Sequence, residues 1–278
     1  MLKNLILFFG KIVCLLPRRF QIFLGSCIGL LFWKISKRRR DITINNIKFA
    51  LPNIKDPQKI ALNCYKHYGN LFLELLFNPY MTTHFSKYIS WKNEDLILNK
   101  LKKKQGVILL TAHFGNWETL GTFSQFDTNM WPIYQEQSNK FVDDLLIHLR
   151  TAIGVKLIKK SDRETMLQCL KNGEVLGNVG DQGRAIPISF FGQESRFPAG
   201  PVKLAIETNA AIVFGVGIRK GLNIEHHIIE EIPIIKGKTN EETYFKTMSV
   251  FAKKLEDLII QYPEQYFWLH DIWRRHKK

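Results

Sequence analysis

Cysteine is scarce in this chain of 278 residues, and no two cysteines form a C-x-x-C pair. The four are Cys14, Cys27, Cys64 and Cys169. Their scattered positions fit neither a disulfide framework nor a zinc site, so we expect no metal and favour a reducing compartment.

The signatures of several enzyme classes are also absent. The chain has no G-x-S-x-G, no G-x-x-x-x-G-K-[ST], no H-E-x-x-H and no G-x-G-x-x-G. These absences argue against a serine nucleophile elbow, a P-loop, a zincin site and a dinucleotide-binding turn.

Acidic residues are missing from the first forty positions, which hold nine Lys or Arg; Asp41 is the first acid. These charges are interleaved with Leu, Ile and Phe, a mixture that is more typical of a membrane surface than of a DNA-binding face. The apolar stretches 5–16 and 20–33 are each shorter than the roughly 20 residues that a bilayer-spanning helix needs.

We therefore expect residues 1–40 to form a membrane-anchor helix that lies in the interface or spans the bilayer with snorkelling ends. The basic residues 37–40 would then face the cytoplasm. A buried core helix is the alternative. A cleaved signal peptide is disfavoured, because no small-residue cleavage site follows the second stretch.

The remaining residues, 41–278, are expected to form one globular domain. The chain is 45% hydrophobic and 12% aromatic, which is enough for a sizeable core. Its formal net charge of +15 predicts an acidic partner, such as anionic lipid, an acidic carrier protein or nucleic acid.

Strand and helix patterns alternate through the second half of the chain. Short apolar runs predict strands at 107–111, 133–134, 155–158, 175–179, 211–216 and 224–232. Helical spacing predicts helices at 139–153, 164–171, 201–208 and 241–261. This alternation predicts an α/β fold with a mixed, mostly parallel sheet flanked by helices.

The motif H-F-G-N-W-E begins just past the predicted strand 107–111 and carries His113 and Glu118. Active sites of α/β folds gather at the carboxyl ends of strands. We expect Glu118, in the first turn of the next helix, to accept a hydrogen bond from the His113 imidazole. Such a pair can take a proton from a hydroxyl. The alternative is a capping Glu and a hydrogen-bonded structural His.

Four blocks in the same order resemble the late (secondary) acyltransferases of lipid A biosynthesis, within the HX4D/E glycerolipid acyltransferase superfamily. They are H-F-G-N-W-E; Gly180-Asp181-Gln182 after a strand; Phe190-Phe191-Gly192 with the stretch that follows it; and the block P-E-Q-Y-F-W-L-H that begins at Pro263. The resemblance runs from about Leu16 to the C-terminus.

This resemblance implies an acyltransferase domain over 41–278 and an activity: transfer of a fatty acyl chain from acyl carrier protein to a hydroxyl of a lipid A precursor. His113 and Glu118 would be the general-base pair, and the acyl thioester would be a substrate, so no cofactor is expected. The expected location is the inner membrane, with the domain on an anionic membrane surface facing the cytoplasm. No nucleic acid is expected as a partner.

Four further residues are candidates for substrate binding. Arg150 lies in a stretch resembling the family's segment that ends in an arginine, and would stabilise an oxyanion or bind a phosphate, or else be a surface arginine. Asp181 and Gln182 would shape the pocket or hold the surroundings of His113, or cap a turn. Asn116 would line the turn.

Two other functions remain open at this point. The first is an acyltransferase for another lipid acceptor, a lysophospholipid or glycolipid, with acyl-CoA as a possible donor. The second is a basic membrane-surface or nucleic-acid-binding protein, which would leave H-F-G-N-W-E unexplained.

Overall fold

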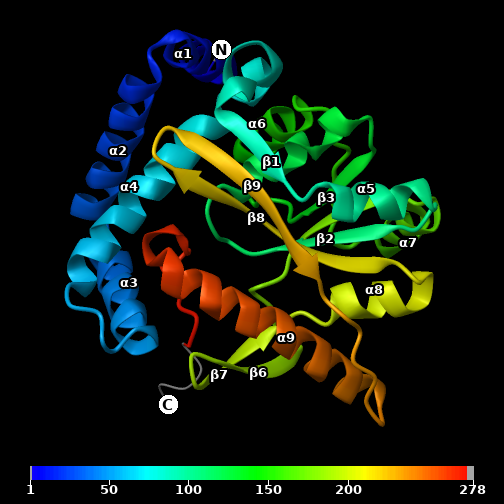
Figure 1. Ribbon diagram of the computed structural model, residues 1–278. Helices are drawn as coiled ribbons and strands as arrows, with labels where there is room; N and C mark the ends of the chain where they lie inside the picture. Colours follow the sequence, from blue (N-terminus) through cyan, green and yellow to red (C-terminus); the bar gives the residue numbers. More distant parts are fainter. Residues whose placement is uncertain (1, 274–278) are drawn as a thin grey trace.

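The computed structural model describes residues 2–273, and its centre is a seven-stranded sheet in the order β1-β9-β8-β2-β5-β3-β4. Figure 1 shows helices on both sides of this sheet. The strands are β1 (Ile89–Lys92), β2 (Val107–Thr111), β3 (Met130–Tyr134), β4 (Ile158–Lys159), β5 (Val175–Val179), β8 (Ala211–Lys220) and β9 (Asn223–Glu231).

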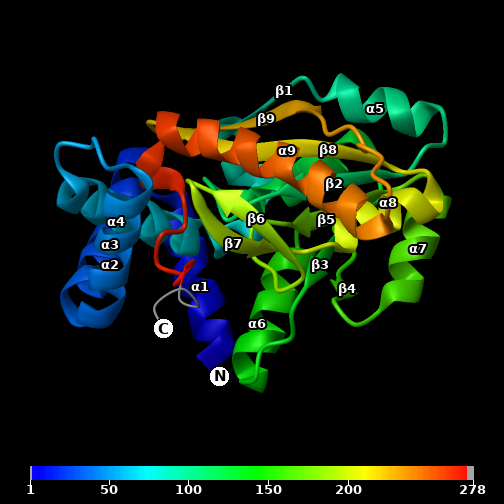
Figure 2. The same cartoon turned by 90° about the horizontal axis from the view of Figure 1, so that it is seen from below.

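Five neighbouring strands, from β8 through β2, β5 and β3 to β4, run parallel, whereas β9 pairs antiparallel with β8 and carries β1 at the edge. The expected mixed, mostly parallel sheet is therefore confirmed. A separate hairpin of β6 (Ile186–Phe190) and β7 (Gln193–Phe197) packs under helix α9 (Asn240–Gln261); Figure 2 shows this arrangement.

Strand β2 is buried along its whole length because both faces of the sheet are covered. Ile108 and Leu110 join the core on one face, with Phe251 of α9. Val107 and Leu109 join the core on the other face, with Phe123. An uninterrupted apolar run is what a doubly covered parallel strand requires.

The flanking helices complete the domain. They are α1 (Leu2–Leu15), α2 (Arg18–Ile35), α3 (Lys37–Ala50), α4 (Pro57–Leu75), α5 (Asp95–Lys102), α6 (Lys140–Thr151), α7 (Arg163–Lys171) and α8 (Gly200–Thr208). Short helical turns are η1 (Asn78–Tyr80), η2 (Met81–Phe85), η3 (Ser86–Tyr88), η4 (Trp117–Phe126) and η5 (Pro263–Gln265).

The N-terminal region differs from the single anchor helix that the sequence predicts. Extended backbone at Pro17 separates α1 from α2, and α2 packs closely along α4. A Cβ atom added to Gly29 would lie 2.2 Å from the Tyr65 carbonyl oxygen, so the two helices approach nearly backbone to backbone. Within residues 2–273, no helix is both long enough and apolar enough to cross a membrane. Position 40, where we expected the anchor to end, falls inside α3.

Several elements escaped sequence reasoning. Strand β1 and the β6–β7 hairpin were not predicted, and the strand expected at 155–158 is the two-residue β4. The residues of β1 alternate between half-buried and exposed, as at a sheet edge, so they lack the apolar run that marks a central strand.

Candidate active site

The register of β2 and β5 places the segments that follow these two strands side by side. Thr111 pairs with Val179, and the Gly180 amide donates to the Thr111 carbonyl over 2.8 Å. Both strands therefore end at the same edge of the sheet. His113, two residues past Thr111, and Asp181, two residues past Val179, meet there.

The His113 imidazole is held on one side by Asp181. Its Nδ1 lies 2.8 Å from the Asp181 Oδ1, and the Asp181 side chain is fully buried while 28% of the His113 side chain is exposed. The rings of Trp117 and Phe267 lie 5.1 Å and 5.9 Å from the imidazole. In the described part of the chain, the His113 Nε2 makes no hydrogen bond to protein, so this nitrogen can face a substrate.

Two opposing effects set the pKa of His113. Burial favours the neutral ring, but the charge and hydrogen bond of Asp181 favour the imidazolium more strongly, with a smaller contribution from Glu118. The pKa of His113 is therefore raised above its usual value.

The turn that follows His113 is fixed through its backbone. The Phe267 amide donates to the His113 carbonyl over 2.9 Å, and the Gly115 amide donates to the Gln265 carbonyl over 2.7 Å. Gly115 has a φ of +58°, and a Cβ atom there would lie 1.9 Å from the Gly217 oxygen. Only glycine fits between this turn and β8. The C-terminal block that begins at Pro263 thus braces the site.

The structure corrects the expected partner of Glu118. Its carboxylate does not accept a hydrogen bond from His113; Asp181 does. Glu118 instead receives two bonds from Arg150 of α6, at 2.9 Å from Nε and 2.6 Å from Nη2. A planar guanidinium matches a carboxylate in this bidentate way. Burial disfavours the charge on Arg150, but Glu118 outweighs it and raises the pKa of Arg150.

The remaining predicted site residues lie at different depths. Asn116 is 1% exposed, and both ends of its side chain are engaged: Oδ1 accepts from the Thr119 amide, and Nδ2 donates to Glu74 over 2.7 Å. Asn116 thus caps η4 from inside the turn, and its contact with substrate stays a prediction. Gln182 is half-buried beside Asp181.

A buried carboxylate, Glu74 of α4, was missed by sequence reasoning. It is 1% exposed and pairs with Arg18 of α2 and Arg219 of β8 as well as with Asn116. Burial alone would raise the pKa of Glu74, but the two guanidinium groups lower it to about 2. The only hint in the sequence is an acid within an otherwise apolar helical run.

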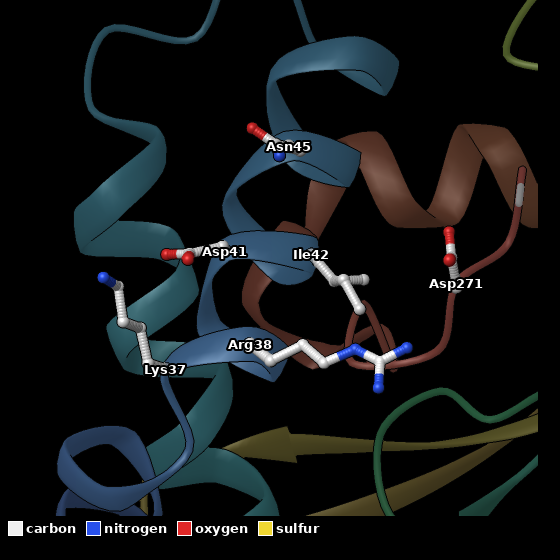
Figure 3. Close-up of a pocket in the computed structure, with 6 residues that line it drawn as sticks. All are labelled: Lys37, Arg38, Asp41, Ile42, Asn45 and Asp271. Atoms are coloured by element: carbon white, nitrogen blue, oxygen red, sulfur yellow. The ribbon is translucent and has the colours of Figure 1, made fainter. Parts of the chain in front are cut away.

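Basic residues gather beside the site on α3. An open cleft of about 540 Å³ is lined by Lys37, Arg38, Asp41, Ile42, Asn45 and Asp271. Figure 3 shows the Arg38 side chain reaching from α3 toward the segment that carries Asp271. Arg39 donates to the Leu269 carbonyl, two residues past the Phe267 that contacts His113. The basic residues at 274–278 lie outside the described residues.

Within the part of the chain that the structure describes, the His113 side chain is hydrogen-bonded to a carboxylate and to no Ser, Thr or Cys side chain. A histidine with a carboxylate behind it and a free nitrogen in front can remove a proton from a hydroxyl. Arg150, which the Glu118 carboxylate holds by two bonds, lies near this histidine. Both groups lie at the carboxyl edge of the α/β sheet, where the active sites of such folds gather.

Comparison with known proteins identifies the family of the chain. A sequence model described as bacterial lipid A biosynthesis acyltransferase matches residues 1–275. The lipid A biosynthesis palmitoleoyltransferase of Escherichia coli K12 is 22% identical over 265 residues, covering 92% of this chain and 85% of that protein. The lipid A biosynthesis lauroyltransferase of the same organism is 24% identical over 261 residues, covering 89% and 83%.

A phosphatidylinositol mannoside acyltransferase of Mycobacterium tuberculosis (strain CDC 1551 / Oshkosh) is 28% identical over 126 residues, covering 39% of this chain and 37% of that protein. The protein is thus an acyltransferase that acts on lipid acceptors. The chain belongs to the family of bacterial lipid A biosynthesis acyltransferases.

Proposed function

We propose that the protein moves a fatty acyl chain from acyl carrier protein to a hydroxyl of a lipid A precursor, with His113 as the general base. The observation that carries this proposal is the His113 imidazole, which Asp181 holds at Nδ1 and whose Nε2 makes no hydrogen bond within residues 2–273. Membership of the lipid A acyltransferase family supports the acceptor class.

In the proposed reaction, the His113 Nε2 takes the proton of the acceptor hydroxyl. The oxygen attacks the thioester carbonyl, a new C–O bond forms, and the C–S bond then breaks. The imidazolium returns its proton to the departing thiolate. Asp181 stabilises the imidazolium between these steps, as a carboxylate does in hydrolase triads. The thioester supplies the activated acyl group, so the proposed reaction uses no cofactor.

Glu118 takes a different part from the one that the sequence suggested, whereas Arg150 keeps the expected role of stabilising an oxyanion. Because Glu118 holds the Arg150 guanidinium by two bonds, its role in the proposal is to aim that cation at the developing oxyanion. Glu118 also favours the protonated state of His113 through space. His113 and Glu118 thus remain the centre of the site, with Asp181 as the direct partner of the imidazole.

The acidic carrier protein is expected to approach over basic surface. In the part of the chain that the structure describes, Lys37, Arg38 and Arg39 form no salt bridge, and Lys37 and Arg38 line the cleft beside the site. Activity should therefore fall with rising ionic strength.

We also place the protein on the cytoplasmic face of the inner membrane. Apolar side chains on α1 and α2 are turned to solvent, among them Phe8 (60% exposed), Phe23 (58%) and Ile35 (68%). Basic residues lie between them, as in helices that rest in a lipid interface. A large exposed apolar surface of this kind calls for a partner.

Vesicle sedimentation tests this placement. Phe8→Asp with Phe23→Asp should reduce binding to vesicles of phosphatidylethanolamine and phosphatidylglycerol by at least about tenfold, because burying two aromatic side chains contributes several kcal/mol. Phe245→Asp, on the exposed side of α9 (45% exposed), is the matched control and should bind like wild type. Equal binding by all three would remove the membrane surface from the proposal.

The activity itself is tested with labelled tetraacyl lipid A precursor and acyl carrier protein thioester. Wild type should add one acyl chain, and His113→Ala and Glu118→Ala, made at equal levels, should lose this activity by orders of magnitude. Variants as active as wild type would overturn the mechanism.

The similarity to phosphatidylinositol mannoside acyltransferases favours a glycolipid as the second candidate acceptor, and a lysophospholipid is tested beside it. The same assay includes these acceptors and acyl-CoA as donor. If only they react, the His113 chemistry stands and the lipid A precursor does not.

A further inference from the structure

The buried cluster around Glu74 joins four elements that are distant in sequence. Its members are Arg18 at the start of α2, Glu74 at the end of α4, Asn116 in the site turn and Arg219 on β8. Each side chain is nine-tenths or more buried. Figure 1 shows where these elements meet, with the β8–β9 turn lying against α2 and α4.

Every bond in the Glu74 cluster passes through the one carboxylate. The Arg219 Nη1 donates to the Glu74 Oε1 over 2.8 Å, and the Asn116 Nδ2 donates to the Glu74 Oε2 over 2.7 Å. The Arg18 guanidinium also donates to the Glu74 Oε1. Arg18 is held in turn by the Leu222 carbonyl and by Gln21. Two cations thus share one anion, so Glu74 cannot be removed without leaving buried positive charge uncompensated.

Asn116 links the turn between His113 and Glu118 to the Glu74 carboxylate. The Asn116 Oδ1 caps the Thr119 amide, so Asn116 sets where η4 begins, and Glu118 lies in the first turn of η4. The backbone of Arg219 exchanges two bonds of 2.9 Å with the Gln265 side chain, and the Gln265 carbonyl accepts from Gly115. Glu74 therefore reaches the segment between His113 and Glu118 from both sides.

We infer that Glu74 is a positioning residue for acyl transfer: through Asn116 and Arg219 it fixes the turn that sets His113 and Glu118 relative to each other, and through Arg18 it ties that turn to the N-terminal helices. The inference rests on the proposed acyl transfer. It assigns Glu74 no contact with substrate. Its effect is geometric, and a misplacement of about 1 Å at a reacting group can cost about 100-fold in rate.

An exchange of the two partners tests this role. Glu74→Gln alone leaves two arginines opposite an uncharged amide, and Asn116→Asp alone sets two carboxylates face to face. In the double variant Glu74→Gln/Asn116→Asp, the amide donates to the carboxylate, the negative charge stays in the cluster, and the carboxylate introduced at position 116 still caps η4.

The single variants should lose about 10- to 100-fold in kcat, with KM within about twofold of wild type, and the double variant should recover most of that loss. The stability control is Met248→Ala, which creates a cavity beside α9, away from the site. The kcat of this variant and that of Glu74→Gln are compared at a temperature where both proteins are folded. A merely structural Glu74 predicts kcat losses that follow thermal stability, so Met248→Ala would lose as much as Glu74→Gln. That result would overturn the inference, as would a folded double variant without recovered kcat.

A second measurement separates this inference from the proposed function. Titration of ring-labelled histidines by NMR, with the His113 signal assigned from His113→Ala, needs no turnover. Loosening the turn should lengthen the His113–Asp181 contact and lower the pKa of His113 in Glu74→Gln, with return toward wild type in the double variant. Wild type that transfers no acyl group refutes the proposed function. An unchanged His113 titration in every variant refutes the positioning role.

Discussion

Asp181 Oδ1 lies 2.8 Å from His113 Nδ1 although 68 residues separate the two in sequence. The pairing of β2 with β5 brings them together, and the buried carboxylate faces the imidazole. This relationship distinguishes the two imidazole nitrogens, since Nδ1 is bound to Asp181 whereas Nε2 has no hydrogen-bond partner among the described residues.

Asp181→Asn should lower kcat by about 10³- to 10⁴-fold, because the amide neither stabilises the imidazolium nor holds the required tautomer. The wild-type rate should rise with pH through the raised pKa of His113, since only the neutral ring accepts a proton. In the variant this acidic limb should move to lower pH. A pH profile of kcat checks both effects. Asp162→Asn, at the exposed N-cap of α7, is the control and should leave the profile in place.

Arg150→Lys should reduce kcat by about 10- to 100-fold, because an ammonium cannot reproduce the two-bond contact with Glu118. The matched control is Arg163→Lys, whose arginine pairs with Glu207 on the exposed surface. The kcat of both variants is measured by steady-state kinetics. Similar rates for the two would mean that the Glu118–Arg150 pair is only structural.

Gly115→Ala should destabilise the protein by more than the roughly 1–2 kcal/mol that left-handed backbone costs a non-glycine residue. The added Cβ would also lie 1.9 Å from the Gly217 oxygen, so the turn has to move. Gly192→Ala separates the two effects, because Gly192 has a φ of +76° and nothing within 4 Å of its Cβ position. Urea unfolding should rank Gly115→Ala well below Gly192→Ala, and equal losses would contradict the close approach.

Two buried histidines should make stability fall between pH 7 and pH 5. Burial lowers the pKa of His67 and of His226 to about 3, helped by Arg219 and by His227 respectively. Each ring therefore binds a proton more readily in the unfolded chain than in the folded protein. The free energy of unfolding thus decreases as pH falls from 6.5 toward 3. The expected slope is about 1.4 kcal/mol per pH unit for each histidine.

His226→Gln should lessen this slope in urea unfolding, whereas His148→Gln, on the exposed side of α6, should not. A slope unchanged in His226→Gln would indicate that His226 is already protonated or hydrated in the folded protein.

The sequence by itself determined the central strands, the helices between them and the position of H-F-G-N-W-E past a strand end. Apolar runs such as 107–111 and 175–179 carry this information because burial on both sheet faces demands them. The four sequence blocks, in their order, likewise indicated the family. What they left undetermined is which carboxylate meets His113, since spacing along the chain favours Glu118, only five residues away.

Only the tertiary structure decided that partner. Strand register set Asp181 against His113, a bidentate contact turned Glu118 toward α6, and Asn116 became an internal cap held by Glu74. The N-terminal helices followed the same rule: their apolar pattern fits both a membrane and a core, and contact with α4 settled which side of α2 is buried. Local sequence limits which residues can act, whereas the partners of polar side chains depend on long-range packing that a local pattern does not encode.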